Sequence, residues 1–167
     1  KDIKNIKYAD SFVFNPHKWM LTNFDCSLYY VKDEEKLIKT LEIHPEYLKS
    51  TTKNIKNYKD WSIQLGRRFR ALKLWFVIRS YGVDGIKKYL RNHINLAKYL
   101  KKIITDDKDF ELTTNQNMNM INFRFNPKNS KNNNEINKLN IKLIDKLNKT
   151  GKIYLSHTMI NDIYSIR

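Results

Sequence analysis

The chain has 167 residues, of which 41% are hydrophobic and 29% charged, so its composition is globular and excludes disordered and collagen-like classes. Lysine and arginine number 32 against 17 for aspartate and glutamate, which gives a formal net charge of +15. Because lysines recur from Lys1 to Lys152 among many asparagines, a compositional bias explains this charge better than a dedicated nucleic-acid surface.

Cysteine content and apolar runs indicate the compartment. Cys26 is the one cysteine, which excludes an internal disulfide framework and fits a reducing compartment. The longest apolar run, residues 74–78, is far below the ~20 residues that a membrane helix needs. No signal peptide is visible. We therefore expect a soluble, cytoplasmic protein that binds neither membranes nor nucleic acid.

Two short strands and a helix are the first predicted elements. Residues 8–14 and 27–31 are rich in aromatic and β-branched side chains, which is typical of strands. Residues 34–41 follow a helical period, with Asp33 as the N-cap. Between residues 43 and 61 the period fails, which predicts a long, mobile surface loop of a kind that is usually functional.

Helices dominate the middle of the chain. A helical period runs from Leu65 to a break at Gly82, and we expect Trp75 and Phe76 on this helix to be core residues. After Asp84 a second helix continues to residue 104, with the clearest pattern in the chain.

The last part of the chain alternates strands with one helix. We expect strands at residues 110–113, 120–125, 152–156 and 163–167 and a helix at 135–148. This order of elements predicts a small α+β layer. The chain lacks an initiator Met and stops within a predicted strand, so we expect it to be a piece of a longer protein.

Lys18 is the sharpest chemical feature of the sequence. It follows a strand that we expect to be buried and a turn fixed by Pro16, and His17 and Trp19 flank it. Loss of hydration there would favour the uncharged amine that a Schiff base needs. On composition alone, however, a surface lysine is the simpler interpretation of Lys18 in so lysine-rich a chain.

Several blocks of sequence together resemble the pyridoxal-phosphate-dependent aromatic amino acid decarboxylases, most of all the plant members. They include the family's cofactor-lysine segment, its loop motif, its domain junction and a strand near its C-terminus. The blocks are residues 15–19 (NPHKW), 23–26 (NFDC), 44–49 (HPEYLK), 58–61 (YKDW), 65–75 (LGRRFRALKLW) and 153–158 (IYLSHT). Because they follow the family's order over essentially the whole chain, chance agreement does not explain them.

The resemblance implies an α/β fold, that of the fold-type-I pyridoxal-phosphate enzymes. Residues 1–70 would form the C-terminal end of the large cofactor domain, with a mobile loop at about 43–60. Residues 71–167 would form most of a small, truncated C-terminal α+β domain. The resemblance also implies a homodimer. For the complete protein it implies decarboxylation of an aromatic L-amino acid of the DOPA, tyrosine or tryptophan type to the amine and CO₂, whereas we expect the 167-residue chain alone to be inactive.

By the same resemblance, three neighbouring residues bind pyridoxal 5′-phosphate. Lys18 would hold the cofactor as a Schiff base and Asn15 would help to bind its phosphate. His17 would line the site beside them and is counted with the catalytic residues. No metal ion is expected, because one cysteine and scattered histidines offer no ligand cluster.

Three further residues are assigned to the substrate. Tyr47 corresponds to a mobile-loop tyrosine that acts as a general acid toward the substrate after CO₂ is lost. Related aldehyde synthases carry Phe at this position, so Tyr47 favours simple decarboxylation. Phe24 resembles a side-pocket residue that contacts the substrate ring. Gly66 matches a position where glycine occurs in members that accept bulky indole or catechol substrates.

Alternative functions remain open from the sequence. Within the same class, the protein could be an aromatic aldehyde synthase or a decarboxylase of another amino acid. From other classes, a basic nucleic-acid-binding module and a catalytically dead family member are the rivals.

His93 is interpreted as a core histidine, because it lies on the apolar face of its helix.

Overall fold

The computed structural model describes residues 2–43, 56–127 and 132–167 of the chain. The chain divides into two compact units, residues 1–86 and residues 87–167.

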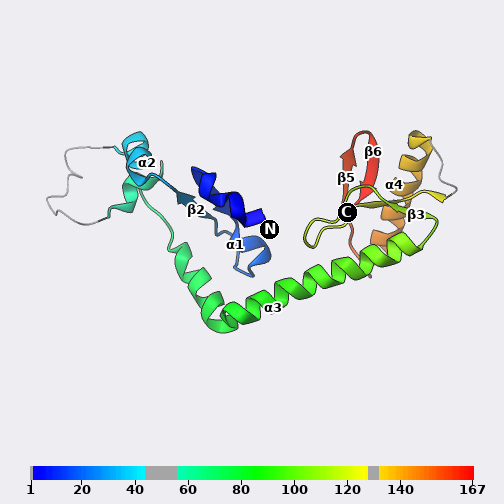
Figure 1. Ribbon diagram of the computed structural model, residues 1–167, viewed down its shortest axis with the longest axis horizontal. Helices are drawn as coiled ribbons and strands as arrows, with labels where there is room; N and C mark the ends of the chain where they lie inside the picture. The colour runs from blue at the N-terminus through cyan, green and yellow to red at the C-terminus, as the bar shows by residue number, and fades with distance from the viewer. Residues whose placement is uncertain (1, 44–55, 128–131) are drawn as a thin grey trace. The chain divides into compact units, whose positions relative to one another are not determined.

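Helix α3, Arg70–Asp106, begins in the first unit and ends in the second (Figure 1). The domain boundary expected near residue 70 coincides with the start of α3 and stays a prediction about the domains of the full-length protein.

In the described ranges, no helix combines the length and the apolar character that crossing a bilayer requires.

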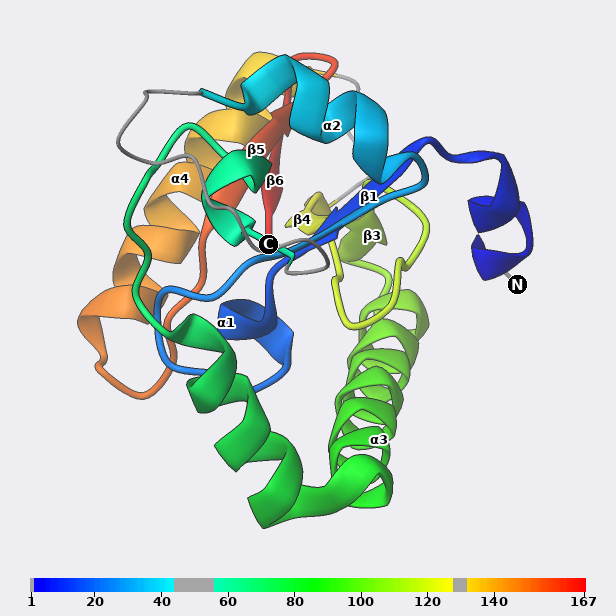
Figure 2. The same cartoon turned by 90° about the vertical axis from the view of Figure 1, so that its left-hand side faces the viewer.

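The first unit contains a β-hairpin and several short helical segments. Its elements before α3 are η1 (Asp2–Tyr8), β1 (Ser11–Phe14), α1 (Pro16–Trp19), β2 (Leu28–Val31), α2 (Glu34–Leu41) and η3 (Tyr58–Trp61). Strands β1 and β2 run side by side (Figure 2). They are antiparallel, and Phe12 pairs with Tyr30. The side chain of Asp33 accepts a hydrogen bond from the backbone N–H of Lys36 at 3.1 Å, so the predicted N-cap of α2 is confirmed.

The turn expected at Asn15 and Pro16 is the beginning of helix α1. Asn15 is the N-cap, and Pro16 stands in the first turn, where its missing N–H leaves no helical hydrogen bond unmade. Three of the four residues of β1 are exposed, so the expectation of a buried strand before Lys18 is wrong for the described chain. A two-stranded ribbon is too small to enclose its own side chains.

Helix α3 has a break where the sequence predicts one. Gly82 has φ 66° and ψ 165°, a conformation that is essentially restricted to glycine. The helix begins at Arg70 rather than at Leu65, because a turn precedes it in which the Arg70 N–H bonds to the Arg68 carbonyl at 2.7 Å.

Two aromatic side chains of α3 before the break are exposed. Trp75 and Phe76 are 53% and 55% exposed, and their rings contact each other edge to face at a centroid distance of 5.2 Å. The expectation that both are core residues is therefore wrong for the described chain, because none of the described helices and strands covers these rings.

A four-stranded antiparallel sheet forms the centre of the second unit (Figure 1). Its elements after α3 are β3 (Phe110–Leu112), β4 (Phe123–Phe125), α4 (Asn133–Lys149), β5 (His157–Ile160) and β6 (Ile163–Ile166). The strand order is β3-β4-β6-β5, and α4 packs on the two central strands. The buried apolar core consists of Ala97, Ile104, Ile121, Phe123, Ile144, Tyr164 and Ile166.

Strand β5 lies further along the chain than the sequence pattern suggests. Asn161 and Asp162 have φ of 48° and 64°, the conformation of a two-residue hairpin turn, and the turn pairs Ile160 with Ile163. This register places His157 opposite Ile166 at the start of β5. The strand predicted at residues 152–156 is therefore wrong.

Asn140 on α4 is fully buried, although the apolar pattern of this helix does not reveal it. Its amide oxygen accepts from the Phe125 N–H, and its amide nitrogen donates to the carbonyls of Phe125 and Ile136, each at 2.8 Å. The two bonds to Phe125 attach α4 to the end of β4. Because every polar atom of the side chain has a partner, burial of this amide is tolerated.

Candidate active site

Helix α1 presents Lys18 to solvent. The backbone N–H of Lys18 donates to the Asn15 carbonyl at 3.0 Å, which closes the single turn that carries the lysine. The Lys18 side chain is exposed, and its amine has neither an ion pair nor a hydrogen bond to any part of the chain that the structure describes. A primary amine on a short, fixed turn is therefore available for a ligand.

The backbone of Cys26 fixes the imidazole of His17. His17 Nδ1 lies 3.1 Å from the Cys26 nitrogen and 2.8 Å from its carbonyl oxygen, and the His17 N–H also faces that carbonyl at 3.3 Å. A neutral ring with its proton on Nε2 accepts from the Cys26 N–H, whereas a ring with the proton on Nδ1 donates to the carbonyl. In both tautomers the same backbone unit determines the orientation of the ring.

The amide oxygen and the amide nitrogen of the Asn15 side chain differ in their hydrogen bonding. Its amide oxygen accepts a hydrogen bond from the Ser27 hydroxyl at 2.6 Å, and its side chain makes no cap to α1. Across the described ranges, the amide nitrogen of Asn15 has no partner. The two N–H donors of this group suit an anion such as a phosphate.

Phe24 is largely exposed, at 83%. Its ring meets the edge of the His17 ring at a centroid distance of 4.9 Å and an angle of 71°. The structure therefore brings the predicted substrate contact against a predicted cofactor contact. Such edge-to-face pairs are favourable arrangements of aromatic rings.

Gly66 lies in the loop between η3 and α3, and Tyr47 lies outside the described residues. A Cβ atom built on Gly66 meets nothing within 4 Å. The described chain therefore leaves room for a side chain at this position. The assignment of Gly66 to the substrate pocket stays a prediction, as does the role of Tyr47.

Hydrogen bonds join the segment after α1 to the start of α3. Oδ1 of Asp25 accepts from Arg68 Nη2, and Oδ2 accepts from Arg70 Nε at 3.0 Å. Lys73 Nζ donates to the carbonyls of Asn23 and Asp25 at 3.0 and 2.8 Å. We call Asp25, Arg68, Arg70 and Lys73 the Asp25 network.

The Asp25 network has an electrostatic consequence. Partial desolvation would raise the pKa of the Asp25 carboxyl, but its backbone hydrogen bond, the hydrogen bond from Arg70 and the charges of Arg68 and Arg70 together lower this pKa below its ordinary value. Asp25 is therefore ionised at neutral pH.

A cavity of about 790 Å³ lies where these two segments meet. Asp25 and Ser27 line it from the first segment, and Arg67 lines it from the loop next to Gly66. Ser27, whose hydroxyl donates to Asn15, and Arg67, next to Gly66, therefore line one cavity although they are far apart in sequence. The pairing of Asp25 with Arg70 across 45 positions is the element that sequence reasoning missed.

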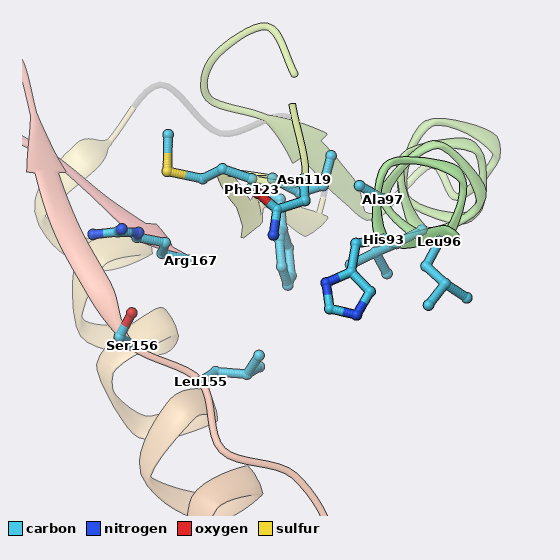
Figure 3. A pocket seen from close by; sticks show the side chains of 11 residues that line it. His93, Leu96, Ala97, Asn119, Phe123, Leu155, Ser156 and Arg167 are labelled. Atoms are coloured by element: carbon cyan, nitrogen blue, oxygen red, sulfur yellow. The ribbon is translucent and has the colours of Figure 1, made fainter. Parts of the chain in front are cut away.

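A second cavity, of about 680 Å³, lies within the second unit. Figure 3 shows the His93 ring directed into it from α3, opposite Leu155 and near Phe123. His93 is half-buried, and its ring contacts Tyr89 at a centroid distance of 4.2 Å. The apolar helix face that carries His93 in the sequence therefore lines a cavity rather than a closed core.

The sequence of the chain matches a known family. Residues 2–126 match the pyridoxal-dependent decarboxylase conserved domain. The chain is 45% identical to tyrosine decarboxylase 3 of Petroselinum crispum, over 99% of this chain and 33% of the relative. It is 44% identical to phenylacetaldehyde synthase of Arabidopsis thaliana, over 95% of this chain and 33% of the relative. The chain thus spans about a third of the length of the curated relatives it matches.

The fold has a solved counterpart. The crystal structure of Oryza sativa TDC with PLP and tryptamine superposes with a TM-score of 0.91 at 33% identity, over 98% of this chain and 35% of that chain. The chain therefore has part of the α/β fold of the fold-type-I pyridoxal-phosphate enzymes, as the sequence predicts. Within that class, it belongs to the pyridoxal-dependent decarboxylase family.

The donor set on and around α1 fits the cofactor of this family. A free primary amine, that of Lys18, matches an aldehyde, and the amide donors of Asn15 match a phosphate. In the described ranges, no group of three or more histidine, cysteine or acidic side chains gathers as metal ligands would.

Proposed function

We propose that the full-length protein is a decarboxylase that uses pyridoxal 5′-phosphate to convert an aromatic L-amino acid to its amine and CO₂. The observation that carries the proposal is the free amine of Lys18, on a turn with the donors of Asn15 and the fixed ring of His17, in a chain of this family. Because the chain spans about a third of its relatives, the activity belongs to the longer protein.

Each of the three residues has a separate task in the proposed mechanism. Lys18 Nζ holds the cofactor through its aldehyde, and Asn15 Nδ2 donates hydrogen bonds to its phosphate. His17, whose ring Cys26 orients, lines the site beside them. When bound, the cofactor supplies a ring that accepts the electron pair released as the carboxyl group leaves.

The substrate ring is proposed to lie against Phe24 and beside Gly66. Phe24 exposes its ring while its backbone is held, and Gly66 adds no side chain that would narrow the space. We therefore expect an indole or catechol amino acid to be accepted at least as well as tyrosine. One small side chain in a pocket wall changes specificity by only about 1–3 kcal/mol, so kcat/KM values for tryptophan, DOPA and tyrosine must be compared directly.

Tyr47 supports amine formation over the alternative, aldehyde formation. Overall identity does not separate the two activities, since the tyrosine decarboxylase and the phenylacetaldehyde synthase match at 45% and 44%. The aldehyde synthases that the sequence resembles carry Phe where this chain has Tyr47. In the proposal, the phenol of Tyr47 returns a proton to the substrate carbon after CO₂ is lost.

The test is to assay the full-length protein and its Tyr47→Phe variant with pyridoxal phosphate and L-tyrosine. The parent protein is expected to release one amine for each CO₂. The variant is expected to consume oxygen and to release aldehyde, ammonia and hydrogen peroxide together with CO₂. A parent protein that forms mostly aldehyde contradicts the proposal, and a variant that makes only amine at the parent rate assigns the acid to another group.

A cytoplasmic homodimer is also part of the proposal. The exposed aromatic face of α3, with Trp75 and Phe76, supports association with further protein surface. Light scattering of the full-length protein tests the dimer, and a monomer that is fully active would contradict it.

A further inference from the structure

We propose that Asp25 is a positioning residue for the substrate: held between Arg68 and Arg70, it fixes Phe24 relative to the Gly66 loop and thereby determines the geometry of the aromatic pocket. The inference rests on the proposed function and adds a residue to it.

The backbone on both sides of Phe24 is attached to helix α3. Asn23 and Asp25 flank Phe24, and their carbonyls accept hydrogen bonds from the same ammonium group, that of Lys73, at 3.0 and 2.8 Å. The Phe24 ring itself is 83% exposed, with only the edge contact to His17 beside it. Its position therefore depends on the tethered backbone and not on packing around the ring.

The carboxylate of Asp25 extends this attachment to the loop that carries Gly66. One oxygen accepts from Arg68, two residues after Gly66, and the other accepts from Arg70 at 3.0 Å. The thiol of the next residue, Cys26, faces the Arg70 carbonyl at 3.9 Å. The Asp25 network thus attaches the segment that carries Phe24 to the loop that carries Gly66.

Orientation, rather than stability, is the main effect of this network. The Arg68 side chain is 73% exposed, and ion pairs of exposed groups contribute little to the free energy of unfolding. The effect on the reaction rate can be larger, because a displacement of about 1 Å in a group that positions a substrate can lower a rate about 100-fold. Loss of the Asp25 charge should therefore affect substrate binding more than folding.

A double-mutant cycle between Asp25 and Phe24 tests this. In the full-length protein with pyridoxal phosphate, Asp25→Asn should raise KM for L-tyrosine about tenfold and lower kcat less than about threefold, because the reacting groups stay in place. In a Phe24→Ala background, Asp25→Asn should change KM less than about twofold, since the ring that Asp25 positions is gone. Equal changes of KM in the two backgrounds would overturn the inference.

Asp33→Asn is the matched control. Asp33 is an aspartate of the same unit that also accepts from a backbone N–H and pairs with a lysine, Lys36, but it caps α2. We expect its loss to leave KM unchanged in both backgrounds. A rise of KM equal to that of Asp25→Asn would show a general effect of removing a negative charge and would overturn the inference.

Amide hydrogen exchange gives a readout that needs no turnover. Exchange in residues 21–27 should be about tenfold faster in Asp25→Asn and in Lys73→Met, which removes the donor to the Asn23 and Asp25 carbonyls, and unchanged in Asp33→Asn. Unchanged exchange in both network variants would overturn the inference. If the unaltered protein releases no CO₂ from aromatic amino acids, the proposed function fails, and the exchange measurement alone decides whether Asp25 positions this segment.

Discussion

Asn15, His17 and Lys18 are neighbours in sequence, yet the fold constrains each of them differently. Asn15 is held at its oxygen by Ser27, and His17 is held at Nδ1 by the backbone of Cys26. The amine of Lys18 has no such contact among the described residues. Replacing Lys18 should therefore change ligand binding without disturbing the fold.

We expect Lys18→Ala in the full-length protein to abolish the near-visible absorbance of pyridoxal phosphate bound through an amine. Because Lys18 is exposed, its loss should change the free energy of unfolding by less than about 0.5 kcal/mol. Absorbance spectra and thermal melts of the purified variant check both statements, with Lys32→Ala, an exposed lysine on the same unit, as control. An undiminished absorbance band in Lys18→Ala would assign the cofactor to another lysine.

The pKa of Asp25 gives a prediction about acid stability. The folded state lowers this pKa below the ordinary value of 3.8, so ionised Asp25 stabilises the fold above that value, and the contribution disappears as pH falls through the lower, folded pKa. The melting temperature of Asp25→Asn should therefore lie below that of the parent at neutral pH and approach it below about pH 4. Melts of both proteins between neutral and acid pH check this, and a gap that stays constant contradicts it.

Resemblance over a short segment of the sequence was sufficient to predict Lys18, Asn15 and His17 as cofactor contacts. It could not reveal the Asp25 network, because Arg70 is 45 positions away and only the folded chain brings the two side chains together. The expected burial of the strand before Lys18 was wrong for a related reason. Burial depends on what packs over a strand, and the hairpin β1–β2 has exposed faces in the described chain.

At the scale of elements, two glycines of α3 differ in backbone conformation, and only one of these conformations requires glycine. Gly82 needs a backbone conformation that only glycine adopts readily, whereas Gly85 is helical. A Cβ at Gly85 would meet the Tyr81 Cβ at 3.7 Å, which is ordinary contact. Since both positions lie in one helix, they form a matched pair of substitutions.

We expect Gly82→Ala to lower the free energy of unfolding by about 1–3 kcal/mol, because alanine is strained in that conformation. Gly85→Ala should raise it by about 0.5–1 kcal/mol, because alanine loses less backbone entropy in a helix. Urea unfolding of the two full-length variants, followed by circular dichroism, measures the difference. If both substitutions changed the free energy of unfolding equally, the backbone conformation at Gly82 would not require glycine.

Periodicity predicted the long and well-capped elements and failed for local ones. Helix α2 and the break at Gly82 were predicted correctly, since an N-cap and a glycine signal them directly. Strand β5 was misplaced because the turn at Asn161 and Asp162, which determines its register, was not recognised. Helix α1 has four residues, too few for a period to be visible.

At the scale of the whole molecule, the exposed apolar side chains of α3 and the greater length of the relatives both indicate that further protein covers this helix. Large apolar side chains on the first part of α3 are exposed, including Trp75 and Phe76. Solvent exposure of neighbouring aromatic rings is unfavourable, so such a face is normally covered by other protein. The curated relatives are about three times as long as the matched region, which provides surface of this kind in those proteins.

We therefore expect the 167-residue chain by itself to release no CO₂ from aromatic amino acids and to associate in solution. The residues proposed to hold the cofactor, Lys18, Asn15 and His17, would account for its aldehyde and part of its phosphate, and the matched relatives are about three times as long as this chain. Association follows because the exposed rings of α3 reduce their contact with water by packing on another chain. The measurement is CO₂ release with added pyridoxal phosphate, beside light scattering of the same sample, with the full-length protein as positive control. A monomeric 167-residue chain that decarboxylates tyrosine at the full-length rate would show that these residues suffice for both the fold and the chemistry.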